Sequence, residues 1–122
     1  DVQVATAVYE KPSLNAHPSY RPQTEPDAEM IDKAIALILE AERPILYTGG
    51  GIINSGPAAS EALRALADML GAPVTSTLMG LGAYPASSPQ WLGMLGMHGT
   101  YEANFAMNKA DLILALGARF DD

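Results

Sequence analysis

Short apolar segments that each run directly into a glycine-containing turn constrain the fold of this chain most strongly. They are residues 45–48, 73–77, 91–95 and 112–116, and the turns that follow contain Gly49, Gly80, Gly96 and Gly117. Helical spacing of apolar residues appears between them, at 57–70 and at 100–109. Strands that alternate with helices of this length form βαβ units, in which the strands are parallel. We therefore predict an α/β fold, a Rossmann-like parallel sheet flanked by helices, with both sheet faces covered and residues 112–116 buried.

The first 26 residues contain four prolines and little periodicity, and we predict that they are an interdomain linker that follows an N-terminal domain. We expect a helix to follow, with Thr24 as its N-cap and Pro44 beyond its end. Its predicted apolar face contains Ile31, Ala34, Ile35, Ile38 and Leu39. The chain begins at Asp1 and ends after a strand-like segment, so we expect a piece of a longer polypeptide in which residues 27–122 form part of a central domain.

Composition excludes several classes of function. The chain has 7 Lys and Arg residues against 14 Asp and Glu residues, a net charge of −7, which argues against nucleic acid and membrane surfaces as partners. No apolar segment approaches the about 18 residues of a membrane span, and no signal peptide is visible. The absence of cysteine excludes disulfides and thiolate chemistry and fits a reducing compartment, and we expect a cytoplasmic protein. The sequence offers no metal-ligand cluster.

The glycine-containing turns are the candidate site. In an open parallel sheet they lie together at the carboxyl edge, where such folds bind ligands. Glycine there exposes backbone N–H groups, so close approach of a ligand would explain the triplet Gly49–Gly51. The alternative, that the glycines only close loops, stays open on spacing alone. The dinucleotide fingerprint G-x-G-x-x-G is not met, and Thr77 stands where an NAD site would need an acidic residue.

Two side chains near these turns have competing interpretations. Arg119 could capture an anion through two hydrogen bonds, or it could form a salt bridge with Asp121 or Asp122. His98 could contact a ligand ring, or it could be solvated or cap the following helix. We predict no catalytic residue and no metal ligand in this chain.

Four segments together resemble a known family. "PILYTGGGI", "TSTLMGLGAYP", "LGMLGMHGTYEANFAM" and "DLILALGARFDD" are similar to the central domain of the acetolactate synthase large-subunit family, which depends on thiamine diphosphate. The resemblance covers nearly all of residues 27–122. It implies condensation of two pyruvates, or of pyruvate with 2-ketobutyrate, with release of CO2 in branched-chain amino-acid biosynthesis. Thiamine diphosphate and Mg²⁺ lie between flanking domains in that family, so this chain should be inactive alone.

The resemblance also implies that this domain binds FAD as a structural cofactor, and "GARFDD" and "LGMHGT" favour the FAD-containing type over the FAD-free type. Because the rest of the domain should close over the adenine end, we expect weak or no FAD binding by this piece. Family members form homodimers or tetramers and can pair with a regulatory small subunit. The implied FAD-binding residues are Gly49, Gly50, Gly51, Thr77, Leu78, Met79, Leu95, Gly96, Met97, His98, Gly117, Ala118, Arg119 and Asp121.

The residues leave other functions open. One is a nucleotide-binding domain of another thiamine-diphosphate enzyme or of an NAD-type oxidoreductase. Another is an interaction domain without a ligand, in which the glycines serve only the turns.

Overall fold

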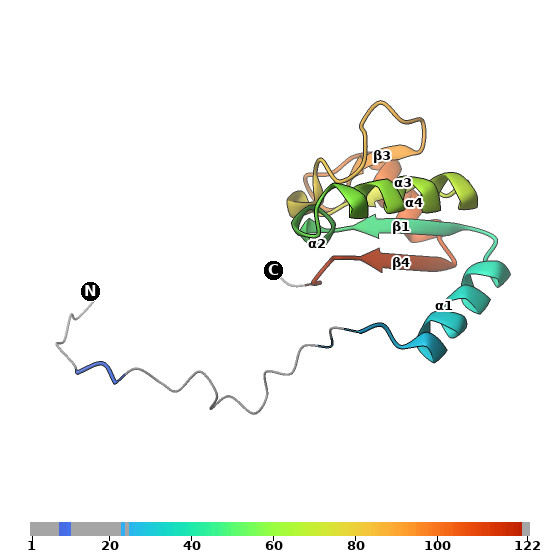
Figure 1. The fold of residues 1–122 in the computed structure, drawn as a ribbon. Coiled ribbons are helices and arrows are strands. Elements are labelled where there is room, and N and C mark those ends of the chain that lie inside the picture. Colours follow the sequence, from blue (N-terminus) through green and yellow to red (C-terminus); the bar gives the residue numbers. More distant parts are fainter. Residues whose placement is uncertain (1–7, 11–22, 24, 121–122) are drawn as a thin grey trace.

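Four parallel strands form a single sheet in the order β3-β2-β1-β4 (Figure 1). The strands are β1 (Pro44–Thr48), β2 (Val74–Ser76), β3 (Trp91–Met94) and β4 (Leu112–Leu116). The helices are α1 (Ala28–Glu40), α2 (Gly50–Asn54), α3 (Pro57–Leu70), the 3-10 helix η1 (Leu78–Gly80) and α4 (Tyr101–Lys109). The predicted α/β fold with a parallel sheet is confirmed.

The computed structural model describes residues 8–10, 23 and 25–120. Most of the predicted linker at 1–26 therefore lies outside the described residues, as does Asp121. Within the described part, no helix has the length and apolar character needed to cross a membrane.

The core lies between the sheet and α3. Leu46 of β1 pairs in register with Val74 of β2 and with Leu114 of β4, so these side chains share one face. Leu63 and Ala67 of α3 are buried against that face. Figure 1 shows α3 in front of the sheet and α4 behind it. This arrangement leaves the carboxyl ends of the strands, and the turns that follow them, at one edge.

The local signals place most helix ends correctly. Thr100 is the N-cap of α4, and its hydroxyl accepts a hydrogen bond from the Ala103 N–H at 3.2 Å. Gly71 ends α3 in the left-handed conformation, with φ of 62°. Thr24 as the N-cap of the first helix is wrong, because the Asp27 carboxylate accepts the hydrogen bond of the Met30 N–H. Pro26 explains the difference, since the residue before a proline disfavours helical backbone.

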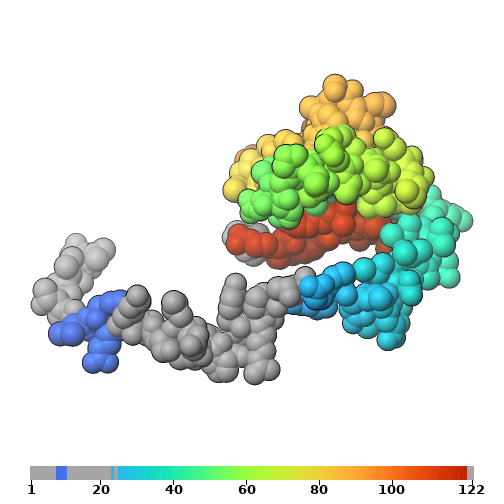
Figure 2. Space-filling view, viewed as in Figure 1, coloured from blue at the N-terminus to red at the C-terminus, as the bar shows by residue number. Residues whose placement is uncertain are grey.

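The expectation of a buried fourth strand is wrong: of the five residues of β4, three are half-buried and two are exposed. β4 is an edge strand, and Ile113 on its second face is 46% exposed, with Ala115 exposed beside it. The predicted apolar face of α1 does not cover them, because α1 has no buried residue. Figure 1 and Figure 2 show α1 beyond the amino end of β1, away from both sheet faces. β4 is therefore covered on its α3 side alone.

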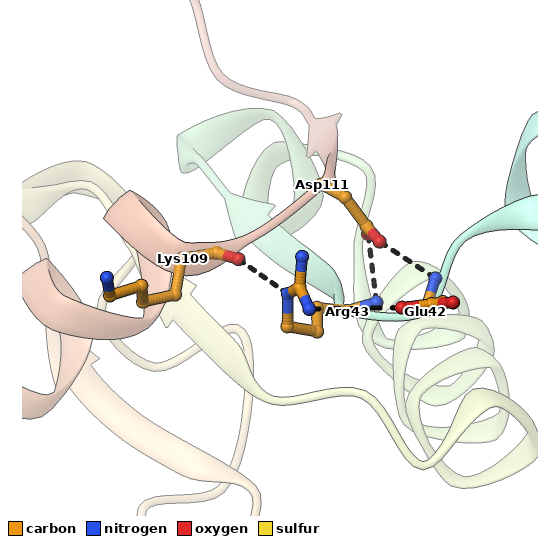
Figure 3. Close-up of polar contacts among 4 residues, drawn as sticks. All are labelled: Glu42, Arg43, Lys109 and Asp111. Atoms are coloured by element: carbon orange, nitrogen blue, oxygen red, sulfur yellow. Dashed lines mark hydrogen bonds and ion pairs between the residues drawn. The ribbon is translucent and has the colours of Figure 1, made fainter.

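Asp111 joins the two connections that lead into β1 and β4 (Figure 3). Its carboxylate accepts hydrogen bonds from the backbone N–H groups of Glu42 and Arg43, each at 2.9 Å. The Arg43 Nε donates to the Lys109 carbonyl oxygen at 2.9 Å. Residues almost seventy positions apart in the sequence are thereby fixed at the amino ends of the paired strands.

The environment of Asp111 lowers its pKa. Loss of hydration raises the pKa, but hydrogen bonds from the N–H groups of Arg43 and Glu42, with the positive charge of Arg43, lower it by more in total. The carboxyl group therefore has a folded-state pKa below its ordinary value. Its stabilising effect is complete above the unfolded-state pKa and disappears as the pH falls through the folded-state pKa.

We predict that Asp111→Ala lowers the midpoint of thermal unfolding at pH 7 by a few degrees, because two N–H groups lose their acceptor. The difference from the unmodified chain should shrink as the pH falls below about 4, the ordinary pKa of the group, and then through the lower folded-state pKa. Circular dichroism melts between pH 3 and pH 7 measure this. The control is Asp68→Ala, which removes an exposed aspartate of α3 and should change the midpoint little. Equal shifts in the two variants would contradict the prediction.

Candidate functional site

A cleft of about 960 Å³ opens at the carboxyl edge of the sheet, and residues that follow all four strands line it. The predicted site residues in its lining are Gly50, Gly51, Thr77, Leu78, Met79, Leu95, Met97, His98, Gly117, Ala118 and Arg119. Gly49 and Gly96 were predicted but are not in the lining. The convergence of the turns on one edge is confirmed, whereas the binding role of these residues stays a prediction.

The glycine triplet is explained by contact between two turns. The Gly49 N–H donates to the Leu116 carbonyl oxygen at 2.9 Å, and the Gly51 N–H donates to that of Gly117 at 3.0 Å. A Cβ on Gly49 would lie 2.6 Å from the Ala118 Cα, and one on Gly51 would lie 2.7 Å from the Gly117 Cα. This close backbone contact, rather than the approach of a ligand, requires glycine at these two positions.

Gly50 lines the cleft together with Gly51, but the nearest atoms to a Cβ on Gly50 belong to Met79 of η1 rather than to the turn after β4. The prediction of a plain turn over the triplet is wrong, since Gly50 and Gly51 begin the short helix α2 after Gly49 as its N-cap. A Cβ on Gly50 would approach Met79 of η1 at 3.2 Å. α2 and η1 thus pack side by side along the cleft.

Thr77 fixes the turn after β2. Its N–H donates to the Thr48 carbonyl oxygen at 2.9 Å, and its hydroxyl accepts from the Gly80 N–H at 3.0 Å. η1 is therefore held against β1, and it presents the exposed apolar side chains of Leu78 and Met79 at the cleft. Such exposed apolar side chains are typical of a surface that binds a partner or ligand.

Asn104 of α4 fixes the turn after β3. Its side-chain amide accepts from the Gly96 N–H at 3.2 Å and donates to the Gly96 carbonyl oxygen at 2.9 Å. Gly96 therefore faces α4, which explains its absence from the cleft lining. Met97, the next residue, is 91% exposed and lines the cleft with His98.

The residues of the cleft that the sequence did not predict are Tyr47, Ile53, Asn54, Met94 and Phe120. Ile53 and Asn54 belong to α2, which was not expected. The rings of Tyr47 and Phe120 have centroids 5.6 Å apart. Tyr47 precedes the first glycine turn by two residues and Phe120 follows Arg119 directly, so their closeness to the predicted turns was the available signal.

The cleft is chemically suited to binding. Its lining combines apolar side chains with glycine backbone, and the lining residue with a formal charge, among those described, is Arg119. In the part of the chain that the structure describes, no group of three or more His, Asp or Glu side chains could hold a metal ion. The arrangement can hold a molecule with flat apolar parts and a negative charge.

Comparison with known proteins identifies relatives. Residues 31–122 match the family model described as "Thiamine pyrophosphate enzyme, central domain". The chain is 53% identical over 104 residues to "Acetolactate synthase large subunit" of Buchnera aphidicola subsp. Schizaphis graminum, covering 85% of this chain and 18% of the relative. It is 49% identical over 121 residues to "Acetolactate synthase 1, chloroplastic" of Zea mays, covering 98% of this chain and 18% of the relative.

A third relative is "Acetolactate synthase large subunit" of Corynebacterium glutamicum. It is 47% identical over 122 residues, covering 100% of this chain and 19% of the relative. The chain thus spans about a fifth of the length of the curated relatives that it matches.

We predict that Gly51→Ala lowers the free energy of unfolding by about 1–3 kcal/mol, because the added methyl group would overlap the Gly117 backbone. Gly50→Ala is the matched control, since it lies in the same helix and its Cβ would meet the Met79 Cβ and carbonyl oxygen at 3.2 Å, a contact that a shift of a few tenths of an ångström relieves. Its loss should be smaller. Urea denaturation followed by circular dichroism measures both, and equal losses would show that the contact between the turns is not what excludes a side chain.

Proposed function

The chain belongs to the thiamine pyrophosphate enzyme central-domain family, and on that premise we propose that it is part of the large subunit of an acetolactate synthase. The observation that supports the proposal is sequence identity. The chain is 47–53% identical to proteins of that name over 85–100% of its length. An NAD-type oxidoreductase domain has no comparable support.

The complete protein would condense two pyruvates, or pyruvate and 2-ketobutyrate, with release of CO2 in branched-chain amino-acid biosynthesis. Thiamine diphosphate, bound with Mg²⁺ outside this chain, would supply the electron sink for that reaction. This chain would contribute a binding surface and no catalytic side chain. We also propose that the complete protein is a cytoplasmic homodimer or homotetramer with a regulatory small subunit as a further partner.

FAD is the ligand that we propose for the cleft. A volume of about 960 Å³ lies at the upper end of the usual range for small-molecule sites and suits a dinucleotide. Arg119 would hold the pyrophosphate region beside the Gly50 backbone, because a guanidinium binds anions well, whereas the Gly51 N–H already donates to the Gly117 carbonyl oxygen. Met79, Met97 and His98 would contact the flavin ring, since thioethers pack favourably against aromatic edges. FAD would have a structural role here.

The activity is tested with the complete large subunit that carries this chain. Supplied with pyruvate, thiamine diphosphate, Mg²⁺ and FAD, it should form acetolactate, measured by colour development after acid decarboxylation to acetoin. The 122-residue chain alone should form none, because the proposed reaction needs groups outside it. A complete subunit that folds and binds thiamine diphosphate but yields no acetolactate would contradict the proposal.

We predict that Arg119→Ala in the complete subunit weakens FAD binding about tenfold or more, because a charge-assisted hydrogen bond to the pyrophosphate is lost. Quenching of flavin fluorescence on titration measures the dissociation constant. Arg64→Ala is the control, since Arg64 lies on α3 outside the cleft. NAD⁺ should not compete with FAD. Unchanged FAD affinity in Arg119→Ala would contradict the proposal that this guanidinium binds the pyrophosphate.

A further inference from the structure

We propose that Met79 and Met97 form a modification site, at which hydrogen peroxide reversibly oxidises two thioethers and thereby weakens binding in the cleft. Met79 lies in η1, after β2, and Met97 lies in the turn after β3. The effect on binding rests on the proposed FAD site, whereas the oxidation itself does not depend on which ligand the cleft holds. The exposure, the position and the chemistry of the two side chains support the proposal.

Solvent has direct access to both side chains. The chain contains six methionines and no cysteine, so thioethers are its oxidisable sulfur groups. Met97 is 91% exposed and Met79 is 73% exposed, whereas Met94, the third methionine of the cleft lining, is half-buried. A dissolved oxidant reacts first with the sulfur atoms that solvent contacts. Peroxide should therefore modify Met79 and Met97 before Met94.

Both methionines lie on turns that other residues hold in place. The Thr77 side chain caps η1, which contains Met79. The Asn104 side-chain amide accepts from the Gly96 N–H and donates to the Gly96 carbonyl oxygen, directly before Met97. Because β2 and β3 are neighbours in the sheet, the two turns lie on the same side of the cleft. The exposed thioethers are therefore fixed features of one cleft wall.

The modification is an oxygen transfer that consumes two electrons from each sulfur. One oxygen atom of hydrogen peroxide forms a bond with the methionine sulfur, the O–O bond breaks, and water leaves. The sulfur is oxidised and the peroxide is reduced, so the step needs no further reactant. Methionine sulfoxide reductases reverse it, with oxidation of two thiols to a disulfide and release of water.

Oxidation removes the property that suits these side chains to the cleft. A thioether is apolar and packs favourably against the edge of an aromatic ring. A sulfoxide is polar and chiral, and it disrupts contacts of this kind. A ligand with flat apolar parts then loses two contacts on the same wall. Conversely, a bound ligand should cover the two sulfur atoms and slow their oxidation.

Met69 provides a comparison within the same chain. It lies on α3, is 79% exposed and does not line the cleft. Its exposure is between that of Met79 and that of Met97, so peroxide should oxidise it as readily. Its oxidation should leave binding unchanged, which separates an effect of the cleft sulfurs from general oxidative damage.

The test uses the complete large subunit, the double variant Met79→Leu with Met97→Leu, and the control Met69→Leu. Leucine has a similar volume to methionine and has no sulfur to oxidise. Each protein is treated with hydrogen peroxide, which is then removed, and peptide mass spectrometry measures the sulfoxide at each methionine. Flavin fluorescence gives the FAD dissociation constant before and after treatment. Each protein is compared with its own untreated sample, so effects of the substitutions themselves cancel.

We expect peroxide to oxidise Met69, Met79 and Met97 in the unmodified subunit and to weaken FAD binding about tenfold. Met69→Leu should show the same loss, whereas the affinity of the double variant should stay within about twofold of its untreated value. Treatment with the two sulfoxide reductases, one for each epimer, should restore binding. Saturating FAD should slow the oxidation of Met79 and Met97 but not that of Met69.

Other outcomes overturn the inference in distinguishable ways. Oxidised Met79 and Met97 with unchanged FAD affinity, or the same loss of affinity in the double variant, would show that these sulfurs do not control binding. Unmodified Met79 and Met97 beside an oxidised Met69 would show that peroxide does not contact them. A subunit that binds no FAD before treatment would contradict the proposed FAD site, and the effect on binding with it.

Discussion

The pairing of β1 with β4 is the contact on which the rest of this structure depends. It joins residues nearly seventy positions apart, from Pro44 opposite Leu112 to Thr48 opposite Leu116. Each end of the pair is held by a different kind of contact. At the amino end the Asp111 carboxylate accepts two backbone hydrogen bonds, and at the carboxyl end glycine backbones of the two turns pack directly on each other. Because the second contact admits no side chain, it fixes how closely the cleft-forming turns approach.

The remaining turns are held in place by side chains behind the cleft. Thr77 ties η1 to β1, and Asn104 ties the turn after β3 to α4. Such prior ordering reduces the conformational entropy that a ligand would otherwise lose on binding. The scaffold beneath is less complete, since Ile113 and Ala115 on the second face of β4 are exposed and α1 has no buried residue. The turns around the cleft are therefore held in place by contacts within this chain, whereas the second face of β4 and α1 are not covered by it.

The sequence predicted the features that depend on local pattern. It did not predict those that depend on contacts between residues far apart in the chain. Apolar segments ending in glycine located every strand, and Thr100 and Gly71 located helix ends, because propensity and capping act within a few residues. The exposure of Ile113 could not be predicted in this way, since it depends on where α1 lies. The same limit applies to Gly49 and Gly51. Their glycine requirement was visible, but the cause is the Gly117–Ala118 backbone rather than a ligand.

Within the cleft, sequence reasoning found the turns and missed the aromatic pair. The reason is physical: Tyr47 and Phe120 meet only because β1 and β4 are neighbours, and Phe120 adopts a backbone conformation that its side chain disfavours. No local preference predicts that conformation. The cleft thus combines glycine backbone, the Arg119 guanidinium and the His98 imidazole with apolar rings and thioethers. Such a lining can select a ligand by shape and charge and hold it still. It therefore fits the structural role that we propose for FAD.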